Sequence, residues 1–122
     1  MTTVLDASAL LARLQSEPGT ELVEQALLDD ARCCAVNWSE TAQKVIAAGG
    51  NWSYARSLLS SYHLKIEPVT AADAEWAAYR WKRQEGLSLA DRLCLALAER
   101  LDTTVLTADT AWGSGGRILQ IR

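Results

Sequence analysis

The sequence is short of several residue types that build common active sites. It has one histidine, His63, which precedes a predicted strand, and this argues against a serine–histidine–aspartate centre. The three cysteines, Cys33, Cys34 and Cys94, form no CxxC pair or Cys/His cluster, so we expect no zinc site and predict buried, reduced thiols. No apolar run approaches the roughly 18 residues of a membrane span, and no basic leader opens the sequence, so we expect a cytoplasmic protein.

Positive charge is also scarce. Lys and Arg number 12 against 15 Asp and Glu, which gives a formal net charge of −3. This balance argues against a protein that coats nucleic acid through a broad basic surface. The chain does contain 49% hydrophobic residues, enough for a buried core, and no linker or repeat divides its 122 residues. We therefore expect a single domain over residues 1–122.

Short apolar segments of β type alternate with longer segments of helical periodicity. This alternation is typical of an α/β domain in which helices cover a mostly parallel sheet. The predicted strands span residues 2–5, 33–36, 64–69, 104–107 and 117–121. The predicted helices span residues 7–14, 20–28, 39–48, 52–61, 70–84 and 89–101, the last being the most apolar.

Four acidic residues lie where such a fold would gather them. Asp6 directly follows the first strand, Glu40 lies just past the second, and Asp109 follows the fourth. Asp91 opens the apolar helix. Because ligands bind beyond the carboxyl ends of parallel strands, we expect the four side chains to meet at one rim of the sheet.

Each of these acids also has a purely structural explanation. Asp6 is well placed to cap a helix, and Asp109 is well placed in a turn. The other two have the spacing of capping boxes, Asn37 with Glu40 and Ser88 with Asp91. A capping role and a functional role therefore both remain open for each residue.

Carboxylates that gather at one rim repel one another. Two of them ~5 Å apart repel by about 3 kcal/mol at an effective dielectric constant near 20. A cation removes that repulsion, and Mg²⁺ or Mn²⁺ suits a set of carboxylate oxygens. An ion held in this way lowers the pKa of bound water and neutralises charge on a phosphate group. The residues by themselves thus indicate metal-dependent hydrolysis of phosphodiester bonds.

The four acidic segments, taken in order, resemble one family. They read VLDASAL at residues 4–10, VNWSE at 36–40, LSLADR at 87–92 and VLTAD at 105–109. Together they look like a PIN domain, and they most resemble the VapC-type toxins of type II toxin–antitoxin pairs. The resemblance covers essentially the whole chain. It departs at Thr110, where relatives often have a basic residue, so Asp109 ranks below the other three acids as a metal ligand.

The resemblance implies a three-layer α/β/α fold and a Mg²⁺- or Mn²⁺-dependent endoribonuclease. It also implies that one quartet is both catalytic and metal-binding: Asp6, Glu40, Asp91 and Asp109. Ser8 and Thr107 would be supporting hydroxyls that orient carboxylates or metal-bound waters. A homodimer and a cognate antitoxin that covers the active site follow from the same resemblance.

Basic and aromatic residues near the acids are candidates for contact with RNA. Arg92 follows Asp91 and is the first candidate for a phosphate contact. Trp112 follows Asp109 closely, and either stacks on a base or packs in the core. We expect the remaining candidates to pack inside the protein or at an interface (Trp38, Trp76 and Trp81) or to lie mostly on solvated helix faces (Arg13, Lys44, Arg56, Lys82 and Arg83).

Two other enzyme classes also place an aspartate after the first strand. A haloacid-dehalogenase-type phosphatase would need a second aspartate two residues later, where this chain has Ser8. A receiver domain would need a lysine after a late strand, and residues 104–120 contain none. A third alternative is a PIN fold that only binds its antitoxin, with little catalysis. The presence of all four acids argues against it.

Overall fold

A five-stranded parallel sheet lies between two layers of helices in the computed structural model, which describes all 122 residues. Its order is β3-β2-β1-β4-β5. The strands are β1 (Thr2–Leu5), β2 (Asp30–Cys34), β3 (Leu64–Glu67), β4 (Thr104–Thr107) and β5 (Ile118–Gln120). The helices are α1 (Ala7–Leu14), α2 (Thr20–Leu28), α3 (Ala35–Ala47), α4 (Trp52–Ser60), α5 (Ala71–Arg80), α6 (Leu89–Leu101) and the short 3₁₀ helix η1 (Thr110–Trp112).

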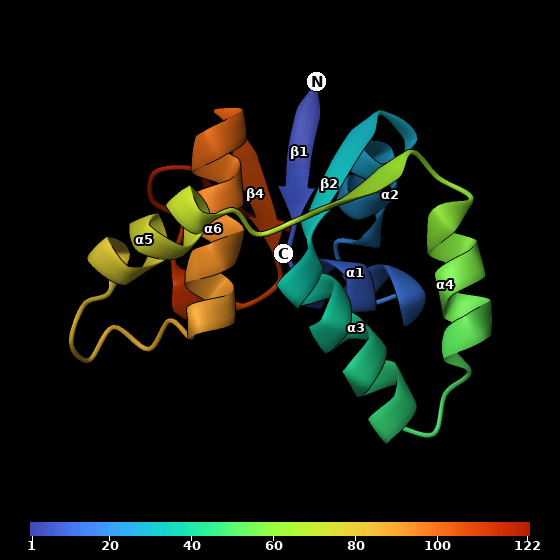
Figure 1. The fold of residues 1–122 in the computed structure, drawn as a ribbon. Helices are drawn as coiled ribbons and strands as arrows, with labels where there is room; N and C mark the ends of the chain where they lie inside the picture. The colour runs from blue at the N-terminus through green and yellow to red at the C-terminus, as the bar shows by residue number, and fades with distance from the viewer.

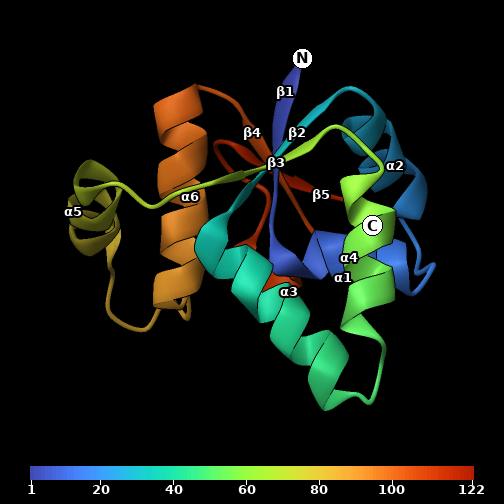
Figure 2. The same ribbon diagram turned by 45° about the vertical axis from the view of Figure 1, so that its right-hand side comes forward.

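The layers confirm the predicted α/β/α architecture. Helices α1 and α2 cover one face of the sheet, and α6 covers the other with α5 packed outside it (Figures 1 and 2). Every pair of neighbouring strands is parallel, so the sheet is parallel throughout. No helix is both long enough and apolar enough to cross a bilayer.

The centre of the sheet is the point at which the order of strands reverses. Strand β1 pairs with β2 on one side and with β4 on the other. The chain leaves β1 into α1, leaves β2 into α3, and leaves β4 toward η1. A crevice forms at such a switch point beyond the carboxyl ends of the strands, which is where ligands bind in open α/β sheets.

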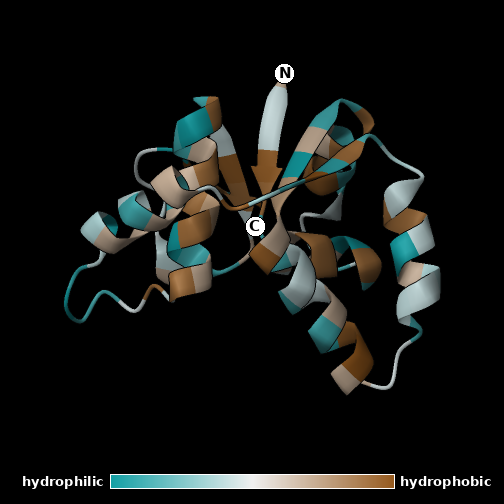
Figure 3. Ribbon diagram, viewed as in Figure 1, coloured by the Kyte–Doolittle hydropathy of each residue, from teal (hydrophilic) through white to brown (hydrophobic).

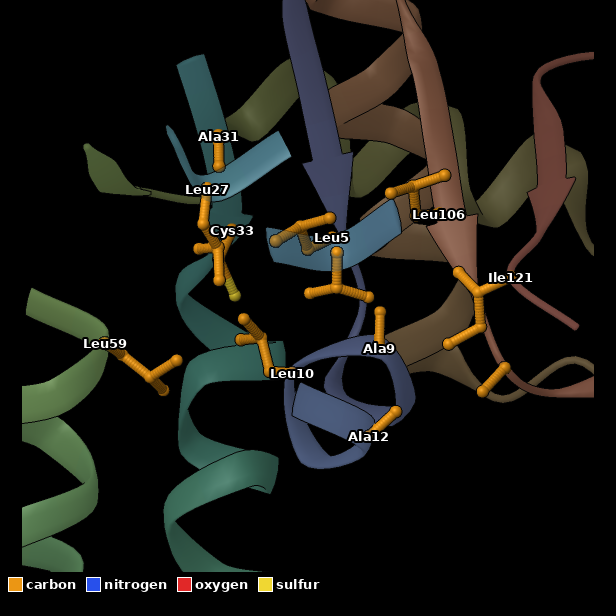
Figure 4. Close-up of a cluster of buried hydrophobic side chains, with 12 residues drawn as sticks. Leu5, Ala9, Leu10, Ala12, Leu27, Ala31, Cys33, Leu59, Leu106 and Ile121 are labelled. Atoms are coloured by element: carbon orange, nitrogen blue, oxygen red, sulfur yellow. The ribbon is translucent and has the colours of Figure 1, made fainter. Parts of the chain in front are cut away.

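Two apolar clusters hold the layers together. Twelve buried residues, among them Leu5 and Leu10, fill the space on the side of α1 and α2 (Figure 4). Ten more, among them Val4 and Leu97, lie on the side of α6. The adjacent residues Val4 and Leu5 face opposite clusters, as the pleat of a strand requires. Figure 3 shows the hydrophobic colours gathered in the central strands.

The second strand starts and ends earlier in the sequence than we predicted. We expected residues 33–36, but β2 ends at Cys34 and α3 begins at Ala35. The early part of β2 contains paired charged residues: Arg32 binds Asp30 of the same strand at 3.0 Å and Glu67 of β3 at 2.7 Å. Because charged residues occupy the first part of this strand, a search for apolar runs does not detect its start.

This displacement also changes the predicted capping box of Asn37 with Glu40. Both residues lie inside α3, whose N-cap is Cys34, so the capping-box prediction is wrong. Helix α5 likewise ends at Arg80 and not at residue 84. Trp81 adopts an extended conformation, and Arg80 makes a bidentate pair with Glu85 that turns the chain back.

Candidate functional site

A small cavity lies at the switch point and collects all four predicted acids. Its volume is about 50 Å³. The lining residues come from the turn after β1, from α3, from the start of α6 and from the turn after β4: Asp6, Ala7, Ser8, Asn37, Glu40, Lys44, Asp91 and Asp109. The structure therefore brings together side chains that are up to about a hundred residues apart in the sequence.

Asp6 is the most constrained of the four acids. It is 4% exposed and caps α1 by accepting a hydrogen bond from the Ala9 N–H at 2.8 Å. Ser8 Oγ donates to Asp6 Oδ1 at 2.7 Å, and Thr107 Oγ1 donates to Asp6 Oδ2 at 2.5 Å. The two hydroxyls that the family resemblance singled out thus both bind this carboxylate. One of its roughly four lone-pair positions, on Oδ2, remains free.

These hydrogen bonds do not fully offset the burial of Asp6. Desolvation raises the pKa of Asp6 from 3.8 to about 6, although hydrogen bonds from Thr107, Ala9 and Ser8 act in the opposite direction. The negative charge of Asp91 raises the pKa further. A carboxylate held in this way is poised to exchange its proton for a metal ion near neutral pH.

The other three carboxylates are each held through one oxygen. Glu40 Oε1 accepts from the amide of Asn37 at 2.9 Å. Asp91 Oδ2 accepts from the N–H of Ser88 at 2.9 Å, which completes the predicted capping box of α6. Asp109 Oδ1 accepts from the N–H of Ala111 at 2.9 Å and caps η1. In each case the second carboxylate oxygen has no hydrogen-bond donor from the protein, so the capping role leaves an oxygen for a ligand.

The charge in the cavity is strongly unbalanced. The chain forms eight ion pairs, and none of them involves the four acids. Lys44 is the only basic residue that lines the cavity, and it has no ion-pair partner. Four carboxylates against one ammonium group make the cavity attractive to cations.

The donor set suits a hard divalent cation. It consists of carboxylate oxygens, and the cavity is far smaller than the roughly 300 Å³ or more of a typical organic ligand site. The side chains do not form a ready-made cage, because no three acidic, histidine or cysteine side chains are placed closely enough to hold an ion. The structure thus supplies the ligand chemistry without a preassembled coordination geometry.

Arg92 does not face the cavity as its place beside Asp91 suggested. Its Nη1 donates to the carbonyl of Ala77 at 2.6 Å, and its Nε is buried without a partner. The guanidinium therefore ties α6 to α5. This geometry corrects the expected phosphate contact, because the group would have to leave its backbone partner first.

The tryptophans divide between the core and the surface. Trp112 is 6% exposed and belongs to the cluster under α6, so its ring is unavailable for stacking on a base. Trp38 packs against the other cluster, and its ring meets Trp52 edge-on at 5.0 Å. Trp81 differs from the expected packing inside the protein, because it is 52% exposed, with the guanidinium of Arg83 over its ring.

Two polar residues of the cavity were not assigned to it from the sequence. Asn37 and Lys44 lie on α3, at three residues before and four residues after Glu40. Residues at these spacings share one face of a helix, so the pattern was present in the sequence. It was obscured because the helix was expected to begin at residue 39, which left Asn37 outside it.

The chain belongs to the PIN domain family. The model of this family, described as "PIN domain", matches residues 3–114, most of the chain. PIN domains are generally nucleases and typically use divalent metal ions. The match confirms the family predicted from the four acidic segments and sets aside the phosphatase and receiver alternatives. No curated protein sequence matches the chain significantly.

Several solved structures share the fold. A toxin–antitoxin complex from Klebsiella pneumoniae has a TM-score of 0.80 at 16% identity, with 98% of each chain covered. VapBC2 from Rickettsia felis, bound to a DNA fragment from its promoter, has a TM-score of 0.72 at 15% identity, covering 98% of this chain and 97% of that chain. FitAcB from Neisseria gonorrhoeae has a TM-score of 0.64 at 21% identity, covering 89% and 88%. At these identities the likeness establishes a common fold.

Proposed function

We propose that the chain is a divalent-metal-dependent endoribonuclease that hydrolyses RNA phosphodiester bonds. The observation that carries the proposal is the cavity at the switch point, where four carboxylates without ion-pair partners meet and three of them, Glu40, Asp91 and Asp109, each keep an oxygen free. Membership of a nuclease family supports phosphodiester hydrolysis. The resemblance to VapC-type toxins supports RNA as the substrate.

The cavity residues have distinct roles in this proposal. Asp6 and Asp91 would be the primary ligands of Mg²⁺ or Mn²⁺, and Asp109 would assist them. The bound ion supplies Lewis-acid chemistry at the phosphate. Ser8 and Thr107 keep the Asp6 carboxylate in one orientation. Glu40, whose Oε2 is free, accepts the proton of the attacking water, and the unpaired Lys44 attracts the phosphate.

We further propose that the chain is the toxin of a type II toxin–antitoxin pair and acts as a homodimer. Support comes from the fold shared with a toxin–antitoxin complex and with VapBC2 over nearly the whole of each chain. The antitoxin would be a protein that covers the acidic cavity. Light scattering of the purified protein tests the dimer, because a monomeric mass at micromolar concentration would contradict it.

The deciding experiment is cleavage of a labelled single-stranded RNA. We expect cleavage with Mg²⁺ or Mn²⁺, none with EDTA, and none by Asp6→Asn. The matched control is Asp102→Asn, because Asp102 lies at the opposite end of α6, is exposed, and has the positive φ that asparagine tolerates. Asp102→Asn should cut at the wild-type rate.

Three results would contradict parts of this proposal. Wild-type cleavage by Asp6→Asn would remove the cavity from the mechanism. Equal cleavage of DNA and RNA would remove the RNA preference. Binding of RNA or antitoxin without any cleavage in Mg²⁺ or Mn²⁺ would favour the catalytically weak interaction module.

A further inference from the structure

Asn37 occupies an unusual position between the two helices that supply acids to the cavity. It is 1% exposed and lies on α3 one turn before Glu40. Its Nδ2 donates to Glu40 Oε1 at 2.9 Å and to the carbonyl of Ala90 at 3.4 Å. Ala90 precedes Asp91 at the start of α6. The buried side-chain amide of Asn37 therefore links the backbone next to Asp91 to the carboxylate of Glu40.

The other polar atom of Asn37 has no partner. Its Oδ1 is buried and receives no hydrogen bond, although Asn37 lines the acidic cavity. Buried acceptors in native proteins are nearly always satisfied by the protein, by water or by a ligand. The carboxylates around it are acceptors themselves when ionised, so they cannot supply the missing donor.

A hydrated divalent cation would supply that donor. Mg²⁺ releases its waters reluctantly and usually keeps several of them when it binds to carboxylates. Such waters donate hydrogen bonds to groups beyond the direct ligands, and those groups in turn orient the ligands. The free Oδ1 of Asn37 is an acceptor of this kind.

We infer that Asn37 is a positioning residue of the acidic site, recognising the hydration shell of a divalent cation. Its Nδ2 holds Glu40 by Oε1 and leaves Oε2 for the ion or its waters, while its Oδ1 accepts from a water of the shell. The bond to Ala90 sets the position of Glu40 relative to the start of α6. This inference rests on the proposed function, because it assumes that the cavity binds a metal ion.

The test is Mn²⁺ affinity, measured from the fall of the free Mn²⁺ electron paramagnetic resonance signal on addition of protein. Asn37→Leu keeps the number and branching of the side-chain heavy atoms and removes both the donor and the acceptor. We expect its Kd for Mn²⁺ to rise by about 10- to 100-fold, the usual effect of removing a group that orients a metal ligand. Asn37→Ser, which cannot reach both Glu40 and Ala90, should shift the Kd in the same direction and serves if the leucine variant does not fold.

The matched control is Val36→Ala. Val36 is the preceding residue on α3 and packs against the cluster under α6 without lining the cavity. This control should lower the melting temperature in EDTA and leave the Kd for Mn²⁺ unchanged. A Kd that rose equally in Val36→Ala and Asn37→Leu would show a general loosening of α3 and would overturn the inference.

A double-mutant cycle with Glu40→Gln tests whether Asn37 acts through Glu40. We expect the double variant to bind Mn²⁺ about as weakly as the poorer single variant. Fully independent effects, or a folded Asn37→Leu with wild-type Kd, would overturn the inference while leaving the nuclease proposal intact. A wild-type protein that bound no Mn²⁺ would overturn the metal site and this inference with it.

Discussion

Asp6→Asn should stabilise the metal-free protein at neutral pH although it removes a central acid. The substitution replaces a buried carboxylate by a neutral group of the same shape. The new amide oxygen can accept from Ala9 and Ser8 as the Oδ1 of Asp6 does, and the new amide nitrogen can donate to Thr107. The hydroxyl of Thr107 can then turn toward Ser8 Oγ, which lies at 3.2 Å. No polar group of the network is left without a partner.

The size of the effect follows from the pKa of Asp6. This pKa rises from 3.8 to about 6 on folding. At about 1.4 kcal/mol for each tenfold change in proton affinity, ionisation of Asp6 costs the folded state about 3 kcal/mol. Because the folded-state pKa is the higher one, protonated Asp6 gives the folded protein additional stability below about pH 4. This additional stability is lost as the pH rises through about 6 and Asp6 ionises. An asparagine side chain at this position would be neutral at every pH, so the variant would not lose it.

The assay is thermal and urea unfolding in EDTA from pH 4 to pH 8. We expect Asp6→Asn to exceed the wild type by about 3 kcal/mol at pH 8, or on the order of 10 °C in melting temperature, and to match it at pH 4. Adding Mn²⁺ should raise the stability of the wild type only. A variant that was less stable than the wild type at pH 8 without metal would refute the reasoning.

Asp73 provides the opposite control. Its exposure of 5% is close to that of Asp6, but Arg100 binds its carboxylate at 3.1 Å. Burial alone raises the pKa of Asp73, and hydrogen bonds from Arg100 and Thr70 outweigh it, so the pKa is lowered overall. Asp73→Asn should therefore destabilise the protein at neutral pH. Equal behaviour of the two variants would show that burial, and not the lack of a cation, decides the outcome.

Three further predictions concern the site and its surroundings. Lys44→Met should reduce the slope of log affinity for single-stranded RNA against log salt by about 0.7, measured by fluorescence anisotropy in a Glu40→Gln background that does not cleave; an unchanged slope would place the phosphate elsewhere. Thr107→Val should raise the pKa of Asp6 and weaken Mn²⁺ binding, whereas Thr107→Ser should restore both, as followed by unfolding against pH and by Mn²⁺ titration. Trp112→Ala should cost ~3–5 kcal/mol in urea unfolding, because its ring fills the core; a cost under about 1 kcal/mol would contradict its burial.

Much of the fold was predictable because its strands and helices follow simple patterns. The bounds of β1 and β4 match the predicted residues 2–5 and 104–107, since both are short runs of the strand-favouring residues Thr and Val with Leu. The start of strand β2 was not predictable from apolar content, because Arg32 is stabilised by Glu67 on a neighbouring strand. A partner 35 residues away is a property of the folded chain and not of the local sequence.

The positions of the acidic residues were predictable from the sequence, but the directions of several neighbouring side chains were not. An acid at the end of a parallel strand is placed by topology alone, so the convergence of Asp6 and Asp109 required only the order of elements. The direction of a long side chain is decided by packing, and this is why Arg92, next to Asp91, turns to Ala77 and away from the cavity. Asn37 was missed because its importance lies in an unpaired atom, which becomes visible only when every neighbour is in place.

The bond between the Thr107 hydroxyl and Asp6 spans 101 positions of the chain. Closing a loop of that length costs about 4 kcal/mol of entropy, which the unfinished polypeptide has nothing to offset. When three quarters of this protein have been synthesised, Asp6 is present but neither Thr107 nor Asp109 has been made, and β1 lacks its neighbour β4. If the chain is the ribonuclease proposed above, its acidic site is incomplete until residues 107–109 have been synthesised, so we expect unfinished copies not to cleave the RNA being translated.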